Sequence, residues 1–171
     1  MTFPTAEGEK AWFALTVKPR HEKAVAQQLG LRDLEHYLPL YKAVRHWSDR
    51  RKIVAACLFP GYVFCRFGYN RRLDVLNLPS VHSIVGFGDT PTPVPESEIE
   101  AIRTILASGH PAGPWPFLRA GQTVRIGSGS LAGVEGILVR EKDALRVVVR
   151  VELLQRAVAV EIDREMIEPL D

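Results

Sequence analysis

The chain has 171 residues, 46% of them hydrophobic and 25% charged, which is an ordinary composition for a globular protein of one domain or two small ones. No secretory signal is predicted, because residues 1–10 are polar, and the longest apolar run, residues 53–65, is too short to cross a membrane. Cys57 and Cys65 form no CxxC motif, so we expect structural cysteines rather than a redox or metal site. We therefore expect a cytoplasmic protein that makes no contact with a membrane.

Charge is distributed unevenly, although the net charge is only +2. Residues 10–72 carry 13 Lys and Arg against 4 Asp and Glu, whereas residues 73–110 carry 1 against 5 and residues 111–171 carry 8 against 9. A basic excess confined to the first part of the chain indicates that this part faces a polyanion. A solvated basic face without a partner is the alternative interpretation.

Strands and helices alternate in the first half of the chain. Apolar runs typical of strands occupy residues 12–17, 37–47, 53–67 and 81–87. Helix-forming stretches occupy residues 20–29, 70–78 and 96–107. The last of these presents Ile99, Ile102 and Leu106 on one face. The polar stretch 48–52 separates two of the extended runs, which predicts a hairpin with a basic tip beside a mixed or antiparallel sheet flanked by helices.

A stretch rich in proline and glycine, residues 109–117, is predicted to link two domains. Beyond it the pattern is all β, with valine-rich runs at residues 123–126, 136–140, 144–153 and 157–162. The valines of residues 147–151 disfavour helix, and strands this short suggest a small barrel, whose closure removes exposed edges. The predicted fold is therefore α+β, with an N-terminal domain at residues 10–108 and a C-terminal all-β barrel at residues 118–171.

Regularly spaced glycines open the second domain. The pattern consists of Gly121, Val124, Ile126, Gly129, Gly133 and Gly136. Val124 and Ile126 alternate inward on a strand, the glycines permit positive φ and a tight turn, and Gly136 keeps the next strand close. The spacing resembles the KOW motif of ribosomal proteins and transcription elongation factors. We expect these glycines to shape the fold rather than to contact a partner.

One apolar segment of the first domain, LFPGYVFC at residues 58–65, contains strand breakers. Pro60 and Gly61 stand between Phe59 and Tyr62, so the segment is either a turn leading into a strand or a display of aromatic side chains. Together with WFALTVKPRHEKAVAQQL, LPSVHSIVGFG and TPTPVPESEIEAI, it resembles the N-terminal domain of the NusG family of bacterial transcription elongation factors. That family includes specialised paralogues such as RfaH and the antiterminators of polysaccharide operons. The resemblance runs from residue 11 to residue 171.

The resemblance implies that the FPGY segment contacts the clamp helices of the RNA polymerase β′ subunit. Phe59 and Tyr62 would then be the interface anchors, and Pro60 and Gly61 would form the turn that presents them, since aromatic side chains often dominate binding energy. The alternative is that both rings fill the core between sheet and helices. For the alternating Val63, Cys65 and Phe67 we expect a position in the core.

The predicted hairpin carries a cluster of cations around an aromatic residue. The candidate nucleic-acid contacts are Arg20, His21, Lys42, Arg45, His46, Trp47, Arg50, Arg51 and Lys52. Cations attract phosphates, and an exposed aromatic ring can stack on an unpaired base. The resemblance implies that the polyanion is the non-template DNA of the transcription bubble. A solvated hairpin is the alternative.

The resemblance implies a further partner for the barrel, either Rho or a small-subunit ribosomal protein. The contact position, a Phe in NusG itself, is Leu154 here, which puts the Rho contact in doubt. Together with the dense basic hairpin, this departure favours a specialised factor over the general one.

No catalytic pattern is found: the five His have no zinc spacing, and the chain has neither GxSxG nor a P-loop. We therefore predict a non-catalytic, monomeric elongation or antitermination factor that needs no cofactor and no metal, binds RNA polymerase and suppresses pausing. The alternative function is that of a ribosome-associated, RNA-binding KOW protein. A ribosomal protein would be expected to have a basic barrel, whereas residues 111–171 carry one more acid than base.

Overall fold

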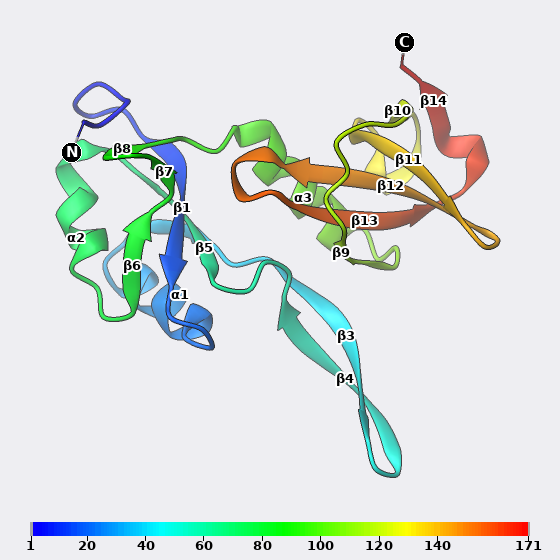
Figure 1. The fold of residues 1–171 in the computed structure, drawn as a ribbon, viewed down its shortest axis with the longest axis horizontal. Helices are drawn as coiled ribbons and strands as arrows, with labels where there is room; N and C mark the ends of the chain where they lie inside the picture. The colour runs from blue at the N-terminus through cyan, green and yellow to red at the C-terminus, as the bar shows by residue number, and fades with distance from the viewer. Residues whose placement is uncertain (1, 171) are drawn as a thin grey trace. The chain divides into compact units, whose positions relative to one another are not determined.

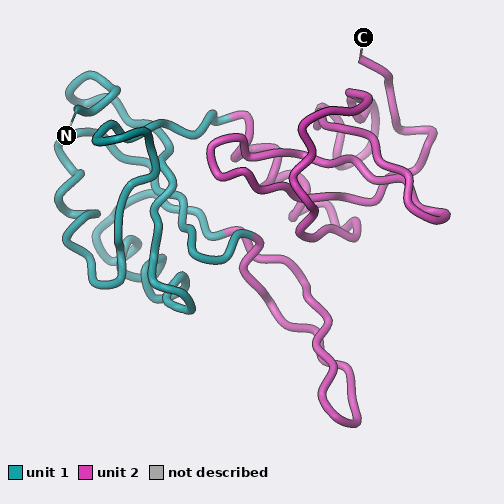
Figure 2. The backbone as a smooth tube through the Cα atoms, in the orientation of Figure 1, with its two compact units in different colours: residues 1–38, 59–96 teal, residues 39–58, 97–171 magenta. Residues whose placement is uncertain are grey.

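The computed structural model describes residues 2–170, and the chain divides into two compact units (Figure 2). Unit 1 comprises Met1–Leu38 and Phe59–Glu96, and unit 2 comprises Pro39–Leu58 and Ser97–Asp171. This division does not follow the predicted domain boundary, because the hairpin and most of the 96–107 helix belong to unit 2. Within the described part of the chain, no helix combines the length and apolarity that crossing a bilayer requires.

Unit 1 is built on a four-stranded antiparallel sheet with the order β2-β5-β1-β6 (Figure 1). Its elements are β1 (Ala11–Val17), α1 (Glu22–Leu31), β2 (Glu35–Tyr37), β5 (Tyr62–Phe67), a 3-10 turn (Tyr69–Arg71), α2 (Arg72–Leu76), β6 (Val81–Ile84), β7 (Gly86–Phe87) and β8 (Thr90–Pro91). Every helix and strand expected in this part of the sequence is present. The predicted strand at 53–67 is interrupted, however, because it divides at residues 58–61 into two strands that belong to different sheets.

One face of this sheet packs on α1 and α2. Val63, Cys65 and Phe67 of β5 lie in one buried cluster with Val25 and Leu29 of α1, as their alternation predicted. Burial raises the pKa of the Cys65 thiol to about 12, so the thiol stays protonated, as expected for a structural cysteine.

Two antiparallel strands in unit 2, β3 (Leu40–Trp47) and β4 (Arg50–Cys57), form the predicted hairpin. Trp47 pairs with Arg50, so the turn consists only of Ser48 and Asp49. The predicted basic turn at 48–52 is therefore shorter than expected, and three of its cations lie on the strand. The reason is register: the strands stay paired up to the last residue before the turn.

The helix α3 has the predicted bounds, Glu96–Ala107. Its buried residues are Ile99, Ile102 and Ile105, whereas Leu106 is only half-buried. The expectation that Leu106 lies on the buried face was wrong, because the buried stripe advances by three residues at each step and reaches residue 105.

The C-terminal part of unit 2 is a six-stranded antiparallel sheet with the order β14-β10-β11-β12-β13-β9. The strands are β9 (Ala112–Trp115), β10 (Thr123–Ile126), β11 (Glu135–Glu141), β12 (Ala144–Val151), β13 (Arg156–Ile162) and β14 (Ile167–Pro169), with 3-10 turns at Gly129–Leu131, Glu152–Leu154 and Arg164–Met166. The valine-rich runs are strands, as predicted. Among the described residues the ladder does not close into a barrel, and its two edge strands carry Pro114 and Pro169, which limits further pairing.

The strands β9 and β14 were not predicted, and β9 lies inside the stretch interpreted as a linker. Its residues pair with β13 from Trp115 opposite Ala157 to Ala112 opposite Val160. Trp115 packs on the same cluster as Ile137 and Val148, so part of the linker completes the C-terminal sheet.

The KOW-like residues shape the fold as expected. Val124 and Ile126 are fully buried, and the backbone φ angles are +80° at Gly129 and +93° at Gly133. At Gly136 the constraint is space rather than φ, because a side chain there would overlap the carbonyl oxygen of Val148 on β12. Glycine at this position therefore permits the close approach of β11 and β12.

We predict that Gly136→Ala lowers the free energy of unfolding by roughly 1–3 kcal/mol, the usual cost of overpacking. The added methyl group meets backbone, which cannot rotate away. Urea unfolding followed by circular dichroism measures the change. The matched control is Gly113→Ala on β9, where the new methyl carbon would lie 3.6 Å from the Tyr41 ring, an ordinary contact. Equal stability of the two variants would contradict the prediction.

Candidate functional site

The FPGY segment forms a tight turn in unit 1. The N–H of Tyr62 donates to the carbonyl oxygen of Phe59 at 3.2 Å, and Gly61 has a φ of +88°. Proline at the second position and glycine with positive φ at the third are the signature of a type II turn. The pair of strand breakers is therefore explained by the turn that precedes β5.

This turn is held by two further hydrogen bonds. The N–H of Gly61 donates to Oε2 of Glu22 on α1 at 3.2 Å, and the N–H of Val17 on β1 donates to the carbonyl oxygen of Gly61 at 2.9 Å. Glu22 is only 5% exposed, which is unusual for a carboxylate. The turn is thus tied to both a helix and a strand of unit 1.

The two aromatic rings of this segment have different environments. Phe59 is 2% exposed and packs edge-on against Phe64, with 6.2 Å between the ring centroids. Tyr62 is half-buried and Pro60 is exposed. The expected surface position is therefore wrong for Phe59 in this structure, because its ring fills the interior. The other three residues of the expected contact, Pro60, Gly61 and Tyr62, reach solvent at least in part.

In unit 2, the hairpin has two faces of different chemistry. Side chains of directly paired residues share one face of a ribbon, and successive residues alternate between faces. Arg45 pairs with Lys52, and Trp47 pairs with Arg50, so these four side chains lie on one face, which we call the cationic face. The Trp47 ring is 51% exposed, and its centroid lies 5.3 Å from Nζ of Lys52 and 5.7 Å from the guanidinium of Arg50.

The other predicted nucleic-acid contacts are divided between two places. Lys42, His46 and Arg51 lie on the opposite face of the same hairpin. Arg20 and His21 belong to unit 1, where Arg20 is exposed and Nδ1 of His21 lies 3.0 Å from Oγ of Ser80. Seven of the nine predicted residues are therefore brought together by one ribbon, and the other two are not part of it.

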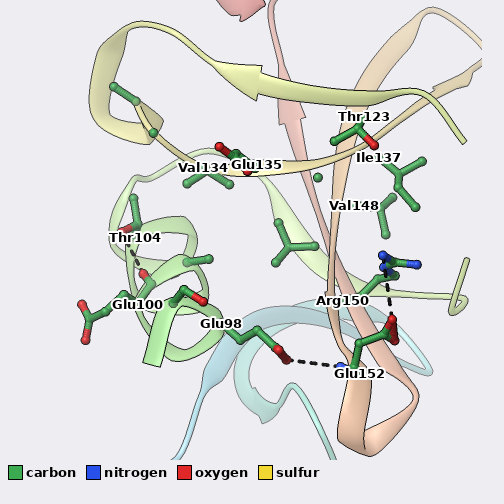
Figure 3. A pocket seen from close by; sticks show the side chains of 16 residues that line it. Glu98, Glu100, Thr104, Thr123, Val134, Glu135, Ile137, Val148, Arg150 and Glu152 are labelled. Atoms are coloured by element: carbon green, nitrogen blue, oxygen red, sulfur yellow. Dashed lines mark hydrogen bonds and ion pairs between the residues drawn. The ribbon is translucent and has the colours of Figure 1, made fainter. Parts of the chain in front are cut away.

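A hollow of about 710 Å³ in unit 2 lies between α3 and the C-terminal sheet (Figure 3). Glu98 of α3 points toward the 3-10 turn after β12, and its Oε1 accepts the backbone N–H of Glu152 at 3.2 Å. Burial raises the pKa of the Glu98 carboxyl, although this hydrogen bond opposes the rise. In the sequence, Glu98 is one of the acids at the start of α3. Its hydrogen-bond partner, the Glu152 N–H, is 54 residues away, so no local sequence pattern could have predicted this contact.

The lining of this hollow does not favour a charged ligand. Of its other acids, Glu100 pairs with Arg103 and Glu135 pairs with Arg125. Among residues 2–170 no group of three or more His, Cys, Asp or Glu is placed to hold a metal ion.

The predicted contact residue Leu154 is 4% exposed in the turn after β12, so its side chain does not reach the surface in this structure.

Comparison with known proteins gives these surfaces a context. The family model described as NusG, transcription termination factor nusG, matches residues 10–103, which is more than half of the chain. The chain belongs to the NusG family. It is therefore a transcription termination/antitermination factor of the NusG type, in a family of transcription factors that are not enzymes. This confirms the resemblance and the non-catalytic role predicted from the sequence.

Relatives and a solved structure agree with this NusG-family assignment. The transcription termination/antitermination protein NusG of Campylobacter jejuni is 26% identical over 172 residues, which cover 93% of this chain and 97% of that protein. NusG of Pseudomonas aeruginosa is 25% identical over 173 residues, covering 93% and 98%. The solved structure of Thermotoga maritima NusG is 20% identical, covers 95% of this chain and 98% of that one, and has a TM-score of 0.57, which confirms the α+β fold.

We predict that Glu98→Gln makes the chain more stable than the wild type at pH 7, because burial raises the pKa of Glu98 above its ordinary value of 4.5. A raised carboxyl pKa gives stability that is complete below the ordinary value and is lost as the pH rises through the folded value. The Gln side chain still accepts the Glu152 N–H and carries no charge. Melting temperatures measured against pH should converge in acid. The exposed Glu100→Gln, which breaks the pair with Arg103, should not stabilise.

Proposed function

We propose that this NusG-family chain binds transcribing RNA polymerase, with the Pro60–Tyr62 corner on the β′ clamp helices and the hairpin on the non-template DNA strand. In this function it suppresses pausing, and the C-terminal sheet recruits a second partner. The observation that carries the proposal is the cationic face of the hairpin. The Trp47 ring is half exposed between two cations, so it does not fill a core. The two-stranded hairpin has no interior at this position that would require a tryptophan.

The chemistry of the cationic face suits a single strand. Arg45, Arg50 and Lys52 can neutralise phosphates, while the Trp47 ring can stack on a base that is not paired. Stacking on an aromatic ring accepts any base, so this face by itself supports binding without strong sequence preference. A duplex offers no free base faces along its length, and the single-stranded region of a transcription bubble does.

We predict that replacing Arg45, Arg50 and Lys52, the three cations of the cationic face, together with Gln weakens binding to a reconstituted elongation complex. Because each phosphate contact to a single strand contributes about 0.7 to the slope of log affinity against log salt, the slope should fall by up to about 2. Fluorescence anisotropy at several salt concentrations measures both quantities.

The matched control for this triple variant removes three exposed cations elsewhere, Arg140, Lys142 and Arg164, from the C-terminal sheet and its turns. It lowers the net charge by the same amount. If both variants lose affinity equally, the effect comes from total charge and not from the hairpin. An unchanged affinity and salt slope in the hairpin variant would exclude the role in nucleic-acid binding.

The corner in unit 1 suits a protein partner. Pro60 and Tyr62 project from a turn that three hydrogen bonds hold in place, so little conformational freedom remains to be lost on binding. An aromatic side chain on a rigid support is typical of the residues that dominate an interface. Phe59 supports this surface from inside, through its contact with Phe64, rather than as a contact residue.

We predict that Tyr62→Ala lowers the affinity for core RNA polymerase by at least about tenfold, as loss of an aromatic anchor does. Tyr69→Ala, which removes an exposed tyrosine elsewhere in unit 1, is the control and should bind like the wild type. Surface plasmon resonance on immobilised core enzyme makes the comparison. Wild-type affinity of the Tyr62→Ala variant would remove the corner from the proposed interface.

We propose that the partner of the C-terminal sheet is Rho or a small-subunit ribosomal protein. Leu154 is buried, so this contact would use its exposed neighbours Glu152 and Gln155. The substitution of Leu for Phe and the basic hairpin support a specialised factor over a general one. A purely ribosomal role fits less well, because the cations concentrate on the hairpin and not on the C-terminal sheet.

A further inference from the structure

The face of the hairpin opposite Trp47 carries an exposed aliphatic pair that the proposed DNA contact does not use. Val44 of β3 and Ile53 of β4 are directly paired, so their side chains lie together on that face. Val44 is 42% and Ile53 is 67% exposed. Exposed aliphatic side chains that occur singly are normal, but two on directly paired residues of neighbouring strands form a small patch.

The charged groups around this patch all have one sign. Lys42 pairs with Ala55 on one side of it, and His46 pairs with Arg51 on the other, so these side chains share the face with Val44 and Ile53. The only acid in residues 39–58 is Asp49, which lies in the turn. We call the set formed by Lys42, Val44, His46, Arg51 and Ile53 the aliphatic face.

Folding of the ribbon does not account for this pair. A two-stranded hairpin has no interior, and a Thr–Thr pair would give comparable β propensity and cross-strand contact without exposing apolar surface. Nucleic acid does not account for it either. Valine and isoleucine offer no flat surface for a base to stack on, and the cationic face already provides Trp47 for that purpose.

We infer that the aliphatic face binds a protein surface that is apolar at its centre and bordered by carboxylates, so that the hairpin lies between the DNA strand and a protein wall of the transcribing polymerase. This inference rests on the proposed function and adds a second, distinct protein contact, separate in the chain from the Pro60–Tyr62 corner. Charge complementarity selects the acidic border, because Lys42 and Arg51 flank the pair without a neighbouring acid. Because the two faces point in opposite directions, both partners can be bound at once.

The test uses the full chain with Val44→Thr and Ile53→Thr combined. Threonine keeps the branched Cβ that favours strand, and its hydroxyl replaces a methyl group of Val44 and the ethyl group of Ile53. We expect this variant to bind a reconstituted elongation complex about tenfold more weakly, because apolar contact is lost, with an unchanged salt slope. Its affinity for a single-stranded DNA oligonucleotide should equal that of the wild type.

Two controls make the result specific. Trp47→Ala combined with Arg50→Gln should show the reverse pattern, with weaker binding to the oligonucleotide and a smaller salt slope. Leu31→Gln removes an aliphatic side chain that is 71% exposed at the end of α1, and it should change neither affinity. Circular dichroism and thermal melting confirm that each variant is folded before binding is compared.

Wild-type binding of the Val44→Thr, Ile53→Thr variant to the elongation complex would overturn the inference and leave the proposed function intact. Equal loss of affinity for the oligonucleotide would also overturn it, because the patch would then belong to the DNA contact. So would a wild-type dimer in analytical ultracentrifugation that the variant cannot form, since the patch would serve self-association. If the wild type does not bind the elongation complex at all, the proposed function and this inference both fail.

Discussion

The position of the FPGY turn in unit 1 depends on the hydrogen bond between the backbone N–H of Gly61 and the buried carboxylate of Glu22. Burying the Glu22 carboxylate to 5% exposure costs free energy unless its oxygens accept hydrogen bonds. The turn places the Gly61 N–H where it can donate one of these bonds. Glycine adopts the φ of +88° at this position without strain, and the type II turn presents its N–H to Glu22 of α1. The turn is thereby fixed where the chain passes from β4 into β5, and Pro60 and Tyr62 are presented as a consequence.

The hairpin follows a different physical logic, since no core holds its outer part, residues 44–53, where every residue is exposed. Its stability comes from eight paired positions and from contacts between neighbouring side chains on each face. An element of this kind can expose tryptophan, cations and aliphatic side chains together, because none of them is needed to fill an interior. Alternation then separates them into a cationic face and an aliphatic face. Two partners of different chemistry can use the same ribbon for this reason.

The C-terminal sheet shows how a small all-β element manages its edges without closing. Pro114 in β9 and Pro169 in β14 remove donors from the outermost strands, and β9 adds Trp115 to the apolar cluster around Ile137 and Val148. The glycine pattern serves packing, most clearly at Gly136, where the Val148 carbonyl oxygen leaves no room for a side chain. The linker stretch is thus partly a structural strand of the sheet it precedes.

Local pattern in the sequence was sufficient for the elements whose stability is local. The bounds of α3, the hairpin, the alternation of Val63, Cys65 and Phe67, and the inward Val124 and Ile126 all follow from periodicity and turn chemistry, and the quoted motifs were enough to indicate the family. Tertiary structure alone decided which side chains are left exposed. Phe59 and Leu154 are buried, Ile105 replaces Leu106 on the face of α3, and Glu98 meets Glu152, because burial and hydrogen bonding depend on residues distant in the chain. Likewise, the division of the hairpin into two faces required the register, since a shift of one residue would exchange every side chain between them.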